Sequence, residues 1–302
     1  MHQYYSLAVS SRLGRETIMR LAAVLVLASL TLAAPAAAAP QLLWETKGLA
    51  QPESVVKDPA TGAIYVSNIN GAIMQKDGNG FIARLKPDGT IIERQWVKGL
   101  NAPTGLALHD RTLYVADVDE LVEINAASGE ILSRHPAKGA IFLNDVAVDQ
   151  DGTVYVSDTP MNTIWRLKDG VFEAWLANDA LKGPNGLLVQ DGKLIVASFG
   201  QLPEQGTPEL GGLLAVDLKD QSVSAIRNDP IGNLDGLQLL EPGIFLVTDW
   251  AAGALYRVGA KGKPERLLKL NKGSADLVYL ADEKTVLVPI MLSNTLVAYK
   301  LD

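Results

Sequence analysis

Five of six equivalent positions in this 302-residue chain carry an oxygen-bearing side chain, and we call the six positions the column. Six short segments each open a similar β-rich stretch, and the second residue of each opening segment belongs to the column. Its members, spaced 40 to 51 residues apart, are Glu53, Thr104, Asn144, Asn185, Asp235 and Ala275. Carboxylate and amide oxygens are the ligands that hard divalent cations prefer. The column therefore predicts a metal site, provided that the fold brings its members together.

The stretch from residue 143 to residue 158, LNDVAVDQDGTVYVSD, shows the unit that must position the column. Apolar residues alternate on both sides of Asp151-Gly152, which predicts two half-buried strands joined by a tight turn. Residues 163–167 and 171–175 predict a third and a fourth strand. An all-β unit of four strands that recurs every 40 to 50 residues is typical of a propeller blade.

Six such units predict an all-β fold, a six-bladed β-propeller with four antiparallel strands per blade. The last repeat has room for only three strands, and residues 41–46 belong to no complete repeat. We therefore predict that the N-terminal strand joins the last blade and closes the ring, which removes exposed sheet edges. The first strands of a propeller line its central channel, so the six column residues should converge there.

Composition narrows the chemistry of this site. The net charge is −7 and no cluster of lysine and arginine occurs, which argues against a nucleic-acid partner. The chain has no cysteine, which excludes disulfides and thiolate ligands, and its three histidines lie off the column. We expect one divalent cation: Ca²⁺ is favoured, and Mg²⁺, Mn²⁺ and Zn²⁺ are the alternatives. The competing interpretation is that Asn, Asp and Thr serve as turn formers, although Glu53 is a poor turn residue.

Residues 1–38 predict a signal peptide with an upstream extension. Met19 is a candidate start, Arg20 is positively charged, residues 21–33 are apolar, and residues 36–38 offer a small-residue cleavage site. An uncleaved membrane anchor is the alternative. Residues 39–302 then form a single propeller domain. We expect a periplasmic or secreted monomer that acts on a small molecule and has no membrane contact after cleavage.

Two connections between second and third strands are long, residues 68–80 and 199–212. Strand alternation places both on the face that carries the column. They are predicted to form a partial lid, with Phe199 and Trp250 as its apolar lining, or else to be tolerated surface insertions. Three aspartates at the ends of second strands are expected to be structural: Asp117, Asp158 and Asp249.

Four of the opening segments resemble those of the SMP-30/gluconolactonase/LRE-like family, six-bladed propellers more distantly related to paraoxonases and strictosidine synthases. The resemblance covers the chain after residue 38 and rests on PES (52–54), LND (143–145), PNG (184–186) and LDG (234–236). It implies that Glu53, Asn185 and Asp235 hold a divalent cation. It also implies that Asn144 lies beside the cation, as a ligand directly or through water, or as a contact to substrate.

Two positions depart from that family. Sugar-lactone members carry an arginine where this chain has Phe142, and a glutamate in the connection where it has Pro160, Met161 and Asn162. In that family both residues are polar side chains that contact the substrate. Their loss predicts a substrate less polar than a sugar lactone, or no lactone at all. We assign substrate contact to Thr104, Phe142, Asn144, Phe199 and Trp250.

The resemblance implies a lactonase, a hydrolase that opens a cyclic ester. The cation would polarise the carbonyl, and Asp235 would act as general base towards the attacking water. Ligation to a cation lowers the basicity of a carboxylate, so the alternative role of Asp235 is only to orient a metal-bound water. The first alternative is a non-catalytic periplasmic propeller that binds a small molecule or protein and holds a structural Ca²⁺. A lyase of the strictosidine-synthase type is a third, less favoured, alternative.

Overall fold

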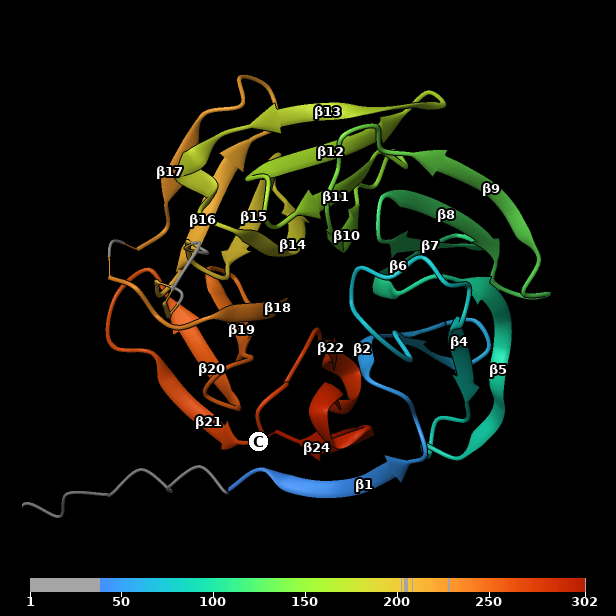
Figure 1. Cartoon of the computed structure of the whole chain (residues 1–302). Helices are drawn as coiled ribbons and strands as arrows, with labels where there is room; N and C mark the ends of the chain where they lie inside the picture. Colours follow the sequence, from blue (N-terminus) through green and yellow to red (C-terminus); the bar gives the residue numbers. More distant parts are fainter. Residues whose placement is uncertain (1–38, 202, 204–205, 208, 228, 302) are drawn as a thin grey trace, which may run out of the picture. The chain divides into compact units, whose positions relative to one another are not determined.

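The computed structural model describes residues 39–301, except residues 202, 204, 205, 208 and 228. The predicted signal peptide lies outside the described residues, so its presence and the division into domains stay predictions. The described chain consists of 24 strands and three short 3-10 helices, and none of its helices has the length and apolarity to cross a membrane. The strands form six antiparallel sheets of four strands each. This confirms the predicted six-bladed propeller, whose blades form a ring in Figure 1.

The first three blades follow the order of the sequence, from the innermost strand outwards. Blade one contains β2 (Pro52–Lys57), β3 (Ile64–Asn68), β4 (Gly80–Leu85) and β5 (Ile91–Leu100). Blade two contains β6 (Pro103–His109), β7 (Thr112–Asp117), β8 (Glu120–Asn125) and β9 (Ile131–Pro136). Blade three contains β10 (Leu143–Val148), β11 (Val154–Asp158), β12 (Thr163–Lys168) and β13 (Val171–Ala177).

Blades four and five repeat this order, whereas blade six is assembled from both ends of the described chain. Blade four contains β14 (Pro184–Gln190), β15 (Lys193–Ser198), β16 (Leu213–Asp217) and β17 (Val223–Ala225). Blade five contains β18 (Leu234–Glu241), β19 (Ile244–Asp249), β20 (Ala254–Gly259) and β21 (Glu265–Lys269). Blade six contains β22 (Val278–Leu280), β23 (Thr285–Ile290), β24 (Thr295–Lys300) and β1 (Gln41–Lys47). The 3-10 helices are η1 (Asp179–Leu181), η2 (Ala281–Glu283) and η3 (Met291–Ser293).

The ring closes as the sequence predicts. Strand β1 pairs antiparallel with β24 over its whole length and supplies the outer strand of blade six (Figure 1). It also contacts the β4–β5 turn of blade one, where the Thr46 hydroxyl donates to the Gly89 carbonyl oxygen at 2.6 Å. Gly89 has φ +82°, and a Cβ there would lie 2.5 Å from the Trp44 ring, so this contact requires glycine.

The inner strands differ from the predicted half-buried pattern. All five residues of β11, and all but the last of β10, are buried on both faces. The outer strand β13 instead contains only exposed and partly buried residues. The reason is that the inner strands of one blade pack between two neighbouring blades, so both of their faces contribute to the core. Alternate side chains of an inner strand therefore pack against different neighbouring blades, and neither set faces water.

The hydrophobic core lies between the blades. Tyr65 and Ile82 of blade one pack in one cluster with Leu106 and Val115 of blade two, and equivalent clusters occur at the other junctions. The Tyr65 hydroxyl also donates to the carbonyl oxygen of residue 126 in blade two, at 2.5 Å. Because each junction buries side chains from two blades, the ring holds its innermost strands in fixed positions around the axis.

Candidate active site

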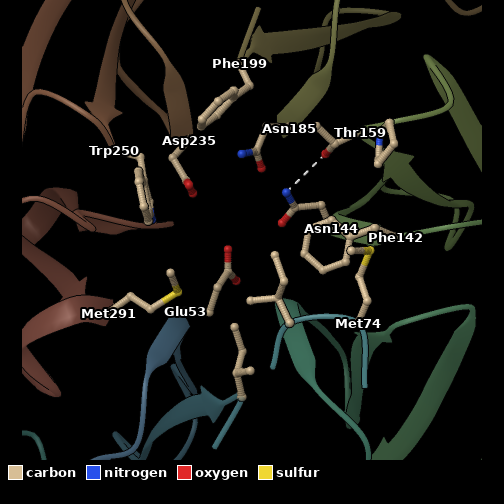
Figure 2. Close-up of a pocket in the computed structure, with 13 residues that line it drawn as sticks. Glu53, Met74, Phe142, Asn144, Thr159, Asn185, Phe199, Asp235, Trp250 and Met291 are labelled. Carbon is tan, nitrogen blue, oxygen red and sulfur yellow. Dashed lines mark hydrogen bonds between the residues drawn. The ribbon is translucent and has the colours of Figure 1, made fainter. Parts of the chain in front are cut away.

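A cavity of about 290 Å³ lies where the opening segments of the blades meet. Figure 2 shows four column residues pointing to its centre from four different blades: Glu53, Asn144, Asn185 and Asp235. The cavity is also lined by Thr159 and by eight apolar side chains, Ile69, Ile73, Met74, Phe142, Pro160, Phe199, Trp250 and Met291. A compact group of polar side chains thus lies at the base of a mostly apolar pocket.

A β-bulge at the start of each first strand turns the column residues towards the axis. In blade one the pairing between β2 and β3 shifts register between Pro52 and Val55, and blades two to five shift at the equivalent place. In blade six an isolated bridge between Ser274 and Ile290 precedes the same one-residue shift. A bulge leaves residues unpaired and re-aims their side chains. The same local geometry therefore directs the longer column side chains, those of Glu53, Asn144, Asn185 and Asp235, to one cavity.

Three oxygen atoms in this group have no hydrogen-bond partner within the described part of the chain. They are Glu53 Oε2, Asn185 Oδ1 and Asp235 Oδ1, on residues that are only 3 to 5% exposed. Asn144 is held differently, because its Nδ2 donates to the Thr159 hydroxyl at 3.1 Å (Figure 2). Leaving a buried polar atom without a partner costs about 1–3 kcal/mol. Three such atoms at one point mark the place where a bound group can satisfy them.

The electrostatics of the cavity favour a positive ligand. Burial raises the pKa of Glu53 well above its ordinary value, and the negative charges of Asp235 and Asp276 raise it further. Burial likewise raises the pKa of Asp235, and Asp276 adds to that shift. None of the described residues lining the cavity is a lysine, arginine or histidine. The negative charges are therefore uncompensated by the protein itself.

Two further carboxylates lie one position after the column, and both tie neighbouring blades together. Asp145 Oδ2 accepts from the Leu187 backbone N–H at 2.6 Å, and Asp276 Oδ2 accepts from the Ser54 hydroxyl at 2.6 Å. Burial raises the pKa of Asp145 well above its ordinary value and that of Asp276 to about 7. Both carboxylates have hydrogen-bond partners for both oxygens, so their role is to join the inner strands.

The raised pKa values of the buried carboxylates predict how the free energy of unfolding changes with pH when the protein is kept in chelator. The unfolded chain ionises Asp276 near its ordinary pKa of 3.8, whereas the folded protein keeps the proton up to about pH 7. The folded state thus binds more protons in this window, and its free energy of unfolding should fall as pH rises from 4 to 7. The expected slope is about 1.4 kcal/mol per pH unit for each such group. Urea unfolding between pH 4.5 and 8 measures it, and Asp276→Asn should flatten the profile. A stability that increases over this range would contradict the prediction.

The other predicted site residues divide into two groups. Phe142, Phe199 and Trp250 line the cavity, where substrate contact was predicted. Thr104 does not line it: this residue is fully buried, and its hydroxyl donates to the Leu143 carbonyl oxygen at 3.0 Å. A short side chain in the column meets the backbone of the next blade before it reaches the axis. Ala275 is likewise fully buried and outside the lining.

The three aspartates expected to be structural bind backbone amides. Asp117 accepts from the N–H groups of residues 101 and 102, and Asp158 accepts from those of residues 141 and 142. Asp249 accepts from residues 251 and 252. In blades two and three, the aspartate thus holds the segment that leads into the opener of the same blade.

The residue that directly follows each second strand forms a further set, of which the sequence analysis predicted only Phe199 and Trp250. Its six members are Ile69, Val118, Thr159, Phe199, Trp250 and Met291. All except Val118 line the cavity, and five donate their backbone N–H to the carbonyl just before the opener. The signal was present in the sequence, since each residue follows a recurring strand end. We refer to these six residues as the second ring.

The long connection between β3 and β4 contributes the rest of the apolar lining. It carries Ile73 and Met74 into the cavity wall. Its backbone is held to the body of the protein, because the Gly71 N–H donates to Gln51 Oε1 at 2.7 Å. Lys76 Nζ also pairs with the Asp119 carboxylate at 2.7 Å. The connection is therefore a wall of the cavity with fixed contacts at both ends.

Comparisons with known proteins concern the fold. No protein-family model matches the chain, and no curated protein sequence matches it. Among solved structures, the gluconolactonase from Xanthomonas campestris superposes with a TM-score of 0.62 at 15% identity, covering 87% of this chain and 89% of that one. A second protein described as a gluconolactonase gives 0.63 at 17% identity over 89% and 93%. A streptogramin B lyase gives 0.60 at 12% identity over 87% and 98%.

These likenesses agree with the resemblance that the opening segments carry in the sequence. At identities of 12 to 17% they establish a shared architecture, not a shared substrate. The lyase shows that the same architecture occurs with a different named activity. The chain has the six-bladed propeller fold of the gluconolactonases.

Proposed function

We propose that this protein is a divalent-metal-dependent lactonase that opens a cyclic ester in the cavity at the ring axis. The observation that carries the proposal is the convergence, in an apolar pocket, of three buried oxygens that have no partner among the described residues, from Glu53, Asn185 and Asp235. A buried group of this kind, with raised carboxylate pKa values, is a candidate functional site. The gluconolactonase neighbours support the choice of an ester substrate.

The donor set suits a hard cation. Among the residues that the structure describes, no three His, Cys, Asp or Glu side chains form a metal-binding group, so two carboxylates must act together with amides. Glu53, Asn185 and Asp235 would hold the ion, and Asn144 would ligate it or bind substrate through its oxygen. Ca²⁺ accepts mixed carboxylate and amide oxygens, whereas Zn²⁺ prefers nitrogen and sulfur. When bound, such a cation supplies Lewis-acid polarisation of the ester carbonyl.

The protein's own groups account for the remaining steps. The apolar walls exclude bulk water from the ester, and Asn144 is oriented by its hydrogen bond to Thr159. Asp235, whose carboxylate points to the cavity centre, orients a water through the oxygen that does not hold the cation, and it takes the proton of that water as the water bonds to the carbonyl carbon. The ring C–O bond breaks, and Asp235 returns the proton to the leaving oxygen. The product is a hydroxy acid.

The test uses the chain from residue 39 onwards, stripped with chelator and supplied with Ca²⁺, Mg²⁺, Mn²⁺ or Zn²⁺. Lactone hydrolysis is followed by acid release, with Asp235→Asn as the site variant and Asp110→Asn as the matched control. Asp110 is an exposed aspartate with positive φ, a conformation that asparagine tolerates. Cation-dependent turnover that Asp235→Asn loses and Asp110→Asn keeps supports the proposal. Turnover in chelator by wild type and Asp235→Asn alike would overturn it.

A non-catalytic binding protein is the second candidate. It is favoured by the scarcity of polar side chains, since apart from the proposed ligands only Thr159 is polar among the described lining residues. Stabilisation by a cation without turnover of any lactone or ester would select this candidate. In both cases we propose a periplasmic or secreted monomer whose partner is a small molecule.

A further inference from the structure

The wall of the cavity offers a substrate almost no hydrogen bonds beyond those of the four column residues. Apart from the single indole N–H of Trp250, the described lining residues add only Thr159, and its hydroxyl is engaged. It donates to the Pro184 carbonyl oxygen at 2.7 Å and accepts from Asn144 Nδ2 at 3.1 Å. A hydroxyl group carried into this pocket would lose its water and find no comparable partner, which costs about as much as any buried unsatisfied polar group.

The second ring is apolar except for Thr159. Phe199 and Trp250 lie on one side of the cavity centre, with Phe142 and Met74 on the opposite side (Figure 2). Ligand pockets typically combine such walls with a few placed polar groups, and 290 Å³ lies at the small end of their range. The cavity therefore has room for a reacting ring with a slender apolar substituent.

Part of the apolar wall is also exposed to solvent. Ile73 and Met74 of the β3–β4 connection are themselves 40% and 52% exposed while lining the cavity. Single exposed apolar residues are ordinary, but neighbouring exposed apolar residues that also line a pocket favour a ligand site there. A chain too long for the cavity would still contact apolar side chains where it leaves.

We propose that the ligand of this cavity is a lactone or ester with an aliphatic substituent, and that the second ring, Phe142 and the β3–β4 connection select for that substituent. As a substrate class, this inference rests on the proposed lactonase function. The cavity then has two parts with different roles. The column holds the ester group, and the apolar wall holds the chain.

The first experiment compares six-membered lactones that differ only in what the ring carries. Glucono-δ-lactone presents hydroxyls, δ-valerolactone carries no substituent, and δ-octalactone and δ-decalactone carry alkyl chains. We expect kcat/KM to rise about four-fold per methylene until the chain leaves the pocket. Glucono-δ-lactone should have a kcat/KM at least about 100-fold below that of δ-decalactone. Equal or better turnover of glucono-δ-lactone would overturn the inference while leaving the lactonase proposal intact.

Variants at Phe142 test whether the apolar wall selects for the alkyl substituent. Its backbone N–H and carbonyl are both hydrogen-bonded, so a changed side chain leaves the local backbone held. Phe142→Ser should raise KM for δ-decalactone about ten-fold or more and lower the alkyl preference, whereas Phe142→Leu should retain most of it. Met74→Ser, on the exposed connection, provides the same comparison if Phe142→Ser fails to fold. An unchanged dependence on chain length in Met74→Ser and in a folded Phe142→Ser would contradict the assignment.

A binding measurement separates the two proposals. The alkyl δ-lactams have the same shape, but their amide resists hydrolysis, so their affinity can be measured by calorimetry with and without Ca²⁺. Tighter binding with longer chains and a negative heat-capacity change would support the aliphatic ligand even if no lactone were turned over. In that case the lactonase proposal alone would fail. Lactam affinity that does not change with chain length would overturn the inference.

Discussion

Asp235→Asn is expected to stabilise the protein in chelator and to remove most of the stabilisation that a divalent cation gives to the wild type. The first effect arises because Asp235 is a buried carboxylate with a raised pKa and an unpartnered oxygen, so ionisation at neutral pH opposes folding. The second arises because asparagine keeps the shape of the side chain but removes one of the two charges at the column. Without a cation the variant should therefore have the higher Tm, and with a cation the lower.

The size of the effect can be bounded. A cation at about 100 times its Kd stabilises the wild type by about 2.7 kcal/mol, which corresponds to a rise in Tm of roughly 5–10 °C for a domain of this size. In Asp235→Asn, cation affinity and cation-dependent turnover should each fall at least about 100-fold. This is the upper end of the loss that follows when only a residue behind a metal ligand is changed. Thermal unfolding at pH 8 in chelator and in a cation titration measures these quantities.

The controls separate ligation from general effects of charge. Glu53→Gln should behave like Asp235→Asn, because both remove a buried charge that points to the same centre. Asp110→Asn removes one exposed charge and should follow the wild type in both conditions. A cation that stabilises all four proteins equally would place its binding site away from the column.

Gly186→Ala is expected to cost at least about 3 kcal/mol of stability and to weaken cation binding. Gly186 follows Asn185, and a Cβ at this position would lie 2.2 Å from the Asp235 carbonyl oxygen and 3.1 Å from the Leu237 amide. No real Cβ contact is that short, so the opener of blade five must move. The substitution would therefore separate Asn185 from Asp235, the two proposed ligands whose backbones meet at this glycine.

Gly212→Ala is the matched control. Gly212 does not have a positive φ, and the nearest atom to an added Cβ is the Asp229 carbonyl oxygen at 3.9 Å, an ordinary contact. Urea unfolding and a cation titration of both variants give the comparison. A Gly186→Ala protein with wild-type stability and cation affinity would show that the openers tolerate displacement and that the column is not a tightly built site.

The repeat in the sequence determined the fold and brought four column residues to one cavity. Because the six units have the same opener and the same strand pattern, each adopts the same bulge at the start of its first strand. The side chains of Glu53, Asn144, Asn185 and Asp235 then line the cavity. Ring closure by β1 followed from the same count, since blade six lacked one strand and a spare strand preceded blade one. These are local properties repeated six times, so the sequence alone could establish them.

Only the tertiary structure decided which side chains meet at the cavity and in what state. Thr104 and Thr159 are the same residue type, but Thr104 turns to a neighbouring carbonyl oxygen whereas Thr159 reaches the cavity and orients Asn144. The raised pKa of Asp276 and the three unpartnered oxygens depend on burial and on distances between blades. The physical reason is that hydrogen-bond satisfaction and desolvation depend on all neighbours in space, and in a propeller most of those neighbours are distant in the sequence.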